Sequence, residues 1–337
     1  MDGTLCTIGD ARYQVDPQFD KGGKRPCRSP FEIDPLIRAG VIYNENSHRN
    51  RGSGRPGLPD QVLAFAPAAP GELAHGLRDF AQRGVNLVVV DGGDGTIREV
   101  LTRLPEAFGG RFPRLAITPT GKTNALALDI GTPLGTPLAA LLAAAHADKP
   151  IKARTCLEIV RPGQTAPERR GFLLGLAAFV RATELAQTHH GLGVFDNAAI
   201  ALTLAGAAMR TLMGRGAGSW RQGESVQASF GAPEAQDRFL VLASTLKRLP
   251  LGLRPFGEPR DGLKVLAVAA PPKRLIRATP RILAGRTDPW LRVAGYHRHD
   301  VTSFDLKFDG DFVLDGEIFR GGELTVREGP RLEFVIP

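Results

Sequence analysis

The segment that most constrains the fold is an apolar run that stops abruptly at a glycine-rich loop. Leu87–Val90 is followed by Asp91-Gly92-Gly93-Asp94-Gly95-Thr96, after which a helical pattern begins. Because the run is continuous rather than alternating, it predicts a strand covered on both faces, as in the parallel sheets of α/β proteins. The chain is therefore expected to contain an α/β unit with this loop at a strand end.

The glycines of this loop suit a phosphate group. Gly92, Gly93 and Gly95 lack a Cβ, so their N–H groups can approach a ligand closely, and the following helix points its positive end at the same place. We expect Thr96 and Glu99 to form a capping box at the helix start. An ordinary strand-to-helix turn is the alternative interpretation of these residues.

Asp94 favours a functional interpretation of the loop. A carboxylate beside bound phosphate repels it, unless a cation such as Mg²⁺ bridges the two or the carboxylate takes a substrate proton. The stretch 92–96 resembles the nucleotide loop of the diacylglycerol kinase catalytic domain, which sphingosine kinases and bacterial lipid kinases share. The same five residues occur in NAD kinases, so the loop alone indicates a superfamily.

The segments around the loop alternate between strand and helix patterns. Strands are predicted at 39–43 and 115–117, and helices at 71–82, after Thr96, up to residue 128 and at 139–147. A strand, helix and strand in succession imply a right-handed crossover and a parallel sheet.

The loop after the first predicted strand is polar and basic. The carboxyl ends of strands are where open α/β sheets bind ligands. Asn44 matches an asparagine of the kinase family, whereas Glu45 replaces the proline that follows it there. Arg49 and Arg51 add positive charge, although a solvated surface loop would have the same composition.

The loop after the third predicted strand, residues 118–124, carries further matches. Pro119, Gly121 and Asn124 match the lipid kinases, and Asn124 is placed to cap the next helix. Lys122 stands where the family usually has threonine, and Ala125 where it usually has an acid. Lys122 could contact phosphate directly.

Beyond residue 150 the pattern becomes mainly β, with strand-like runs at 157–160, 172–174, 239–243 and 263–269 and helices at 182–186 and 198–212. The resemblance implies three parts. Residues 1–37 would be an N-terminal extension, 38–150 a Rossmann-like α/β nucleotide-binding domain, and 151–337 a mainly-β, sandwich-like lipid-substrate domain.

Two acidic motifs of the second half also resemble the kinase family. Phe312–Glu317 matches its last signature, and Asp315 and Glu317 would point to one side of an extended chain. Asp261 matches an acid that often helps to bind a structural cation in the family. Both Asp-Gly pairs are equally typical of hairpin turns.

The resemblance implies a set of roles. Asp94 is the expected base, with Glu317 as the alternative base or metal-linked acid, and Asp261 and Asp315 are the expected metal ligands. The expected nucleotide-binding residues are Asn44, Arg49, Gly92, Gly93, Gly95, Thr96, Gly121, Lys122 and Asn124.

The net charge of +8 favours anionic partners. Seven basic residues between 273 and 298, with Asp288 as the only acid, form either a solvated face or a docking surface for an anionic leaflet. His297 and His299 have the spacing of metal ligands in a strand, without a visible third ligand. The basic residues are Lys273, Arg274, Arg277, Arg281, Arg286, Arg292 and Arg298.

We expect an ATP- and Mg²⁺-dependent kinase that phosphorylates a lipid hydroxyl of diacylglycerol or a sphingoid base. Arg98, where the family usually has asparagine, joins Lys122 and Ala125 in supporting an alternative, a relative that binds nucleotide or lipid without phosphate transfer. NAD kinase is the third option. A nucleic-acid binder is disfavoured because only 7% of the residues are aromatic.

Three scattered cysteines indicate a reducing compartment, and neither a secretory signal nor an apolar stretch long enough for a bilayer is visible. We expect a cytoplasmic protein that can contact the inner face of the membrane. Whether it forms a homodimer stays open.

Overall fold

The computed structural model describes residues 5–8, 11–14, 37–52, 58, 62–69, 71–147, 151–189, 221–230 and 236–337. The chain divides into two compact units, Met1–Leu36 and Ile37–Pro337. In the first unit, β1 (Leu5–Ile8) pairs antiparallel with β2 (Ala11–Gln14). The helix predicted at 198–212 and the predicted boundary at residue 150 lie outside the described residues.

Four parallel strands hold the glycine loop. They are β3 (Ala39–Tyr43), β4 (Leu63–Phe65), β5 (Leu87–Gly92) and β6 (Arg114–Pro119), in the order β6-β5-β3-β4. Every residue of β3 and β5 is buried, which confirms the prediction made from the continuous apolar run. Tyr43 pairs with Asp91 and Asp91 with Thr118, so the carboxyl ends of three strands meet at one edge.

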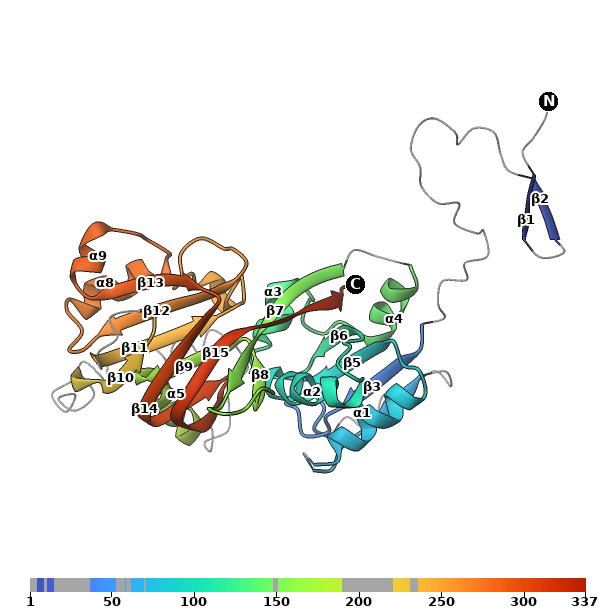
Figure 1. Cartoon of the computed structure of the whole chain (residues 1–337), viewed down its shortest axis with the longest axis horizontal. Helices are drawn as coiled ribbons and strands as arrows, with labels where there is room; N and C mark the ends of the chain where they lie inside the picture. Colours follow the sequence, from blue (N-terminus) through green and yellow to red (C-terminus); the bar gives the residue numbers. More distant parts are fainter. Residues whose placement is uncertain are drawn as a thin grey trace. The chain divides into compact units, whose positions relative to one another are not determined.

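Helices cover both faces of this parallel sheet (Figure 1). They are α1 (Leu73–Gln82), α2 (Asp94–Ala107), α3 (Ala125–Ile130) and α4 (Leu138–His146). Leu77 of α1 and Leu101 of α2 pack with Val88 on one face, and Leu141 of α4 packs with Val89 on the other. Since these side chains are almost fully buried, each stabilises the fold by about 1.5–3 kcal/mol.

The second half is mainly β, as expected. Its strands are β7 (Ile151–Val160), β8 (Arg169–Gly171), β9 (Leu173–Ala177), β10 (Glu224–Ala228), β11 (Gln236–Ser244), β12 (Leu263–Ala269), β13 (Tyr296–Val301), β14 (Ser303–Leu314) and β15 (Glu317–Val335). The described helices there are α5 (Ala178–His189), α8 (Leu275–Leu283) and α9 (Pro289–Val293), with a 3₁₀ turn at Pro250–Gly252.

The long strand β15 joins the two halves. It pairs parallel with β6 at one end and antiparallel with β7 and β14, so 13 of the described strands form one connected sheet. The mixed α/β content is confirmed, whereas the expected combination of a Rossmann-like domain with a sandwich-like domain is not. The β14–β15 hairpin turns next to the glycine loop, since a Cβ added to Gly95 would lie 3.2 Å from Glu317 Oε1.

Among the described helices, none combines the length and the apolar character that crossing a bilayer requires.

Candidate nucleotide-binding and catalytic site

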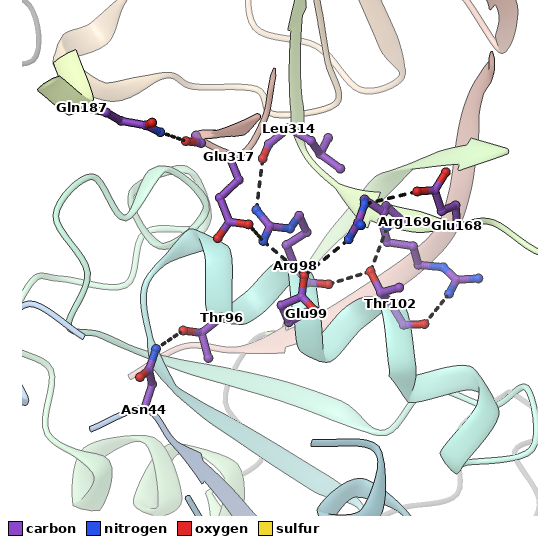
Figure 2. Close-up of polar contacts among 12 residues, drawn as sticks. Asn44, Thr96, Arg98, Glu99, Thr102, Glu168, Arg169, Gln187, Leu314 and Glu317 are labelled. Atoms are coloured by element: carbon purple, nitrogen blue, oxygen red, sulfur yellow. Dashed lines mark hydrogen bonds and ion pairs between the residues drawn. The ribbon is translucent and has the colours of Figure 1, made fainter. Parts of the chain in front are cut away.

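The glycine loop enters α2 earlier than predicted. The helix begins at Asp94 with an extended Gly93 as its N-cap, and no side chain caps it. The predicted capping box of Thr96 and Glu99 is therefore wrong, because both residues already lie inside the helix. Thr96 Oγ1 instead accepts a hydrogen bond from Asn44 Nδ2 at 2.7 Å (Figure 2).

Two of the glycines are required by a close approach of two loops. A Cβ added to Gly93 would lie 2.9 Å from the Cα of Gly121, and one added to Gly121 would lie 2.4 Å from the Cα of Gly93. Real Cβ atoms essentially never come so near to backbone. The loops after β5 and β6 therefore touch backbone to backbone at the carboxyl edge of the sheet.

A polar network at the strand ends fixes the three loops around this contact. The buried carboxylate of Asp91 accepts hydrogen bonds from Asn50 Nδ2 at 2.8 Å and from Thr120 Oγ1 at 3.0 Å. The hydroxyl of Ser47 donates to Thr120 Oγ1 at 2.9 Å. The structure therefore brings the Asn44 loop, the glycine loop and the 118–124 loop together.

Asp94 caps a different helix from the one that it begins. Its carboxylate accepts hydrogen bonds from the backbone N–H groups of Ala125 (3.0 Å) and Leu126 (3.3 Å) at the start of α3. Burial raises the pKa of Asp94, and these backbone hydrogen bonds oppose the rise. Asp94 therefore fixes α3 beside the glycine loop.

The prediction that Asn124 caps α3 with its side chain is wrong. Asn124 precedes α3 in a left-handed conformation, with φ at 51°. Its side-chain amide exchanges hydrogen bonds with the backbone of Gly121, at 2.9 Å and 2.7 Å. Because the carboxylate of Asp94 already occupies the helix start, Asn124 stabilises the 118–124 loop instead.

The second acidic motif forms the turn of the β14–β15 hairpin. Asp315 and Gly316 both have positive φ, 48° and 85°, as a two-residue type I′ turn requires. The extended interpretation is thus wrong and the hairpin alternative is confirmed. The buried carboxylate of Asp315 accepts hydrogen bonds from the N–H groups of Phe172 (3.1 Å) and Leu173 (2.9 Å).

The hairpin turn and the glycine loop bring two acids into electrostatic contact. Burial, followed by the negative charge of Asp94, raises the pKa of Asp315 to about 7. A Cβ added to Gly95 would lie 3.2 Å from Glu317 Oε1, so Glu317 also reaches the loop. Three predicted site acids therefore meet here.

Arg98 connects α2 to this hairpin. Its side chain is only 1% exposed, and its guanidinium donates to Glu317 Oε2 at 2.5 Å and to the carbonyl of Leu314 at 3.2 Å (Figure 2). It also lies 5.1 Å from the ring centre of Phe319. The sequence marked Arg98 only as a departure from the kinase family. Its place beside Ile97 on the apolar side of α2 was the available signal of burial.

Three more charged side chains, Glu99, Arg103 and Arg169, lie close to Arg98 or to its partners. Burial opposes ionisation of Glu99, but the hydrogen bond from Arg103 and the charges of Arg103 and Arg98 lower its pKa. Arg169 lies 3.7 Å from Glu99 Oε1 and stacks 4.0 Å from the ring centre of Phe319. None of these contacts was predicted; Arg103 and Glu99 are one helix turn apart on α2, whereas Arg169 comes from a distant segment.

The remaining predicted nucleotide residues lie at the rim of the site. Lys122 is exposed in the 118–124 loop. Arg49 Nη1 lies 3.9 Å from where a Cβ of Gly135 would stand, so Arg49 points toward the loop that follows α3.

In the structure, the two expected metal ligands Asp261 and Asp315 do not share a site. Asp261 is exposed and pairs with Lys247 at 2.9 Å; the hydrogen bond from Lys247 lowers its pKa. Asp315 has its own partners at Phe172 and Leu173. Within the described residues, no group of three or more histidine, cysteine or acidic side chains could hold a metal, and this includes the stretch with His297 and His299.

The acids near the glycine loop fit a metal that arrives with phosphate better than one held by protein alone. Mg²⁺ usually keeps several waters and takes one or two carboxylates together with substrate phosphates. Asp94 and Asp315 already accept backbone hydrogen bonds. Glu317 pairs with Arg98 through Oε2, but its side chain is 56% exposed and its Oε1 faces Gly95. Glu317 is the carboxylate best placed to contact such an ion.

Comparison with known proteins supports the resemblance seen in the motifs. Residues 38–156 match the family model of the diacylglycerol kinase catalytic domain, so the resemblance is confirmed over that stretch. A segment of 75 residues is 40% identical to "Probable lipid kinase YegS" of Escherichia fergusonii, covering 22% of this chain and 25% of that protein. The protein of the same name from Shigella flexneri is 40% identical over 63 residues, which are 19% of this chain and 21% of that protein. The matched segments thus span about a quarter of these relatives or less.

Solved structures match over most of the chain. The crystal structure of a diacylglycerol kinase from Bacillus anthracis str. Sterne has a TM-score of 0.56 and 14% sequence identity, covering 89% of this chain and 97% of that one. A second structure from the same organism has a TM-score of 0.60 at 16% identity, with the same coverage. At such identity the likeness concerns the fold alone.

Proposed function

We propose that this protein is an ATP-dependent lipid kinase that transfers the γ-phosphate to a hydroxyl of diacylglycerol or of a sphingoid-type acceptor. The observation that carries the proposal is the meeting of two distant motifs. Glu317 of the β14–β15 hairpin reaches Gly95 of the glycine loop, and Asp315 lies within electrostatic reach of Asp94. Phosphoryl transfer needs N–H groups that donate hydrogen bonds to phosphate, together with carboxylates close to the reacting groups.

The loops at the carboxyl edge of the sheet would bind the nucleotide. The N–H groups of the glycine loop and the start of α2 would contact phosphate. Asn44 and Asn124 would flank the nucleotide, while Arg49 and Lys122 would supply positive charge at the rim. Mg²⁺ would spread charge over the phosphates, with Glu317 as its protein ligand.

We propose Asp94 as the general base, with Glu317 as the alternative. A raised pKa, which burial gives to Asp94, brings a carboxylate nearer to the operating pH of a base. The carboxylate of Asp94 accepts backbone hydrogen bonds from Ala125, Leu126 and Asn124, which leaves lone-pair capacity for a substrate proton. Glu317 is more exposed but is held by Arg98.

Residues 151–337 would hold the acyl chains of the acceptor. The lipid would be reached from a membrane surface by peripheral contact on the cytoplasmic side. This part of the proposal rests on the implied role of the mainly-β half.

The test is transfer of label from ATP to a mixed lipid extract with Mg²⁺, with a control lacking lipid. Wild type, Asp94→Asn and Asp79→Asn are compared, because Asp79 is a partly exposed acid in the last turns of α1, where it pairs with Arg83. We expect a labelled lipid from wild type and Asp79→Asn, and none from Asp94→Asn. Absence of labelled lipid with the wild type, despite nucleotide binding, would contradict the proposal for the acceptors in that extract.

A relative that binds nucleotide or lipid without transferring phosphate is the second candidate. One observation favours it, since both candidate bases already have protein partners, Asp94 at α3 and Glu317 at Arg98. Nucleotide binding without transfer to lipid supports this candidate. Label on NAD in a parallel reaction would instead indicate an NAD kinase.

A further inference from the structure

A second concave site lies at the opposite end of the sheet from the parallel strands. It is a hollow of about 400 Å³ beside the edge strand β13, which pairs only with β12 among the described strands. The helices α8 and α9 lie next to this strand (Figure 1). Five strands lie between β13 and β6 in the sheet order, so this hollow is distinct from the glycine loop.

The hollow carries positive charge that its own acids do not balance. Arg286 and Arg292 line it and are exposed, and neither has an ion-pair partner in the part of the chain that the structure describes. The lining acid, Asp288, is engaged by Arg281 at 3.3 Å. The site therefore offers two guanidinium groups to an incoming anion.

Another arginine contributes charge and fixes the shape of the hollow. Arg298 donates to the backbone carbonyls of Pro255 (2.7 Å), Arg286 (2.8 Å) and Ile282 (3.2 Å). These bonds tie β13 to the end of α8 and to the segment that carries Arg286. The site is thus held by backbone contacts before any ligand binds.

Nearby positive charge affects the pKa values of the two histidines of β13. Burial, then the charges of Arg238 and Arg292, lower the pKa of His297. Burial, then the charges of His297 and Arg238, lower the pKa of His299, while Asp300 acts in the opposite direction. In either protonation state, an imidazole has at least one N–H donor for an anion.

We propose that this hollow binds the phosphate group of a phosphorylated ligand. Guanidinium groups recognise phosphate in a bidentate manner, and two of them match the double charge of a phosphomonoester. Ile282 and Leu291 give the site an apolar wall for the rest of the ligand. The volume is in the range of small-molecule sites. The inference does not depend on the proposed kinase activity.

The phosphate can belong to a soluble ester or to a lipid headgroup. The same two helices expose apolar side chains, Ile276 of α8 at 74% and Val293 of α9 at 84%. Apolar residues among basic ones suit the boundary between headgroups and acyl chains. The two sources share one recognition chemistry and are separated by experiment.

The first measurement is titration calorimetry of the full chain with inorganic phosphate and with glycerol 3-phosphate. The double variant Arg286→Gln with Arg292→Gln is compared with Arg277→Gln, an exposed arginine of α8 that rests on Trp290 outside the hollow. We expect the double variant to bind at least about tenfold more weakly, because charge-assisted hydrogen bonds are lost. The Arg277 variant should bind like wild type.

The variant Lys122→Ala distinguishes phosphate binding in this hollow from phosphate binding at the glycine loop. Phosphate affinity that survives in this variant supports the proposal. The proposal is overturned if phosphate affinity disappears in the Lys122 variant, or if wild type and the double arginine variant bind phosphate equally well. It is also overturned if the wild type binds neither phosphate compound nor vesicles.

A second readout follows the histidines by nuclear magnetic resonance. A bound phosphate offsets the charges of Arg238 and Arg292 and adds to that of Asp300, so it should raise the pKa values of His297 and His299. Unchanged histidine titration at saturating phosphate would contradict the proposed location.

Vesicle sedimentation identifies the source of the phosphate. Vesicles of phosphatidylcholine, with or without phosphatidic acid, whose headgroup is a phosphomonoester, are incubated with wild type and the double variant. Sedimentation that requires both phosphatidic acid and the two arginines assigns a lipid headgroup. Binding of glycerol 3-phosphate without such sedimentation assigns a soluble ester.

Discussion

The ion pair between Arg98 and Glu317 offers a direct test of how the two halves of the site are held together. Removing one partner of a fully buried ion pair costs about 3–5 kcal/mol, whereas exposed pairs contribute about 0–1 kcal/mol. Arg98 is 1% exposed, but the side chain of Glu317 is 56% exposed, and Glu99 stays 3.2 Å from the guanidinium. We therefore expect Glu317→Gln to lower the free energy of unfolding by about 1–2 kcal/mol.

A double-mutant cycle measures the interaction itself. Arg98→Met, Glu317→Gln and the combined variant are unfolded in urea beside wild type, and the coupling energy should be about 1 kcal/mol or more. The pair Arg78–Glu106 is the matched control, since it joins two helices at a similar 3.1 Å but is 49% and 70% exposed. Its coupling energy should be about 0.5 kcal/mol or less.

The salt dependence gives a further distinction between the two pairs. Raising the salt concentration should weaken the Arg78–Glu106 coupling more than the Arg98–Glu317 coupling, because burial limits screening. Equal coupling energies in the two cycles would refute the reasoning that the buried guanidinium fixes the hairpin.

Three further perturbations address the loops and the acids. Gly93→Ala places a methyl group 2.9 Å from the neighbouring loop and should weaken nucleotide binding and lower the melting temperature, whereas Gly71→Ala, which meets no atom within 4 Å, should change neither. In labelled-ATP assays, Asp94→Asn should lower transfer at least about 100-fold if it is the base, and Glu317→Gln should lower it less; the reverse order would assign the base to Glu317. Burial and the charge of Asp94 raise the pKa of Asp315 from 3.8 to about 7, so its contribution to stability is complete below about pH 4 and is lost as the pH rises through about 7. Asp315→Asn should therefore flatten the fall in the free energy of unfolding between pH 4 and pH 7, by about 4 kcal/mol at most; a fall as steep as in wild type would contradict this.

Local patterns predicted the elements well where one periodicity dominated. The continuous apolar run 87–90 became the fully buried β5, and the apolar spacing of 71–82 became α1. The capping predictions failed because several side chains compete for each helix start. Asp94, from another loop, displaced Asn124 at α3, and an extended Gly93 moved the start of α2 ahead of Thr96.

The sequence by itself determined two local features: the strand–glycine loop–helix unit and the turn at Asp315-Gly316. Both depend on side-chain burial, missing Cβ atoms and backbone preference, which act within a few residues. The surroundings of the acids were decided only by the tertiary structure. Arg98 and Glu317 are 219 residues apart and meet because β15 continues the sheet of the α/β half, which brings its hairpin to the glycine loop. The ion-pair partner of a charged side chain depends on the path of the whole folded chain, because ion pairs form between residues that the tertiary structure brings close together.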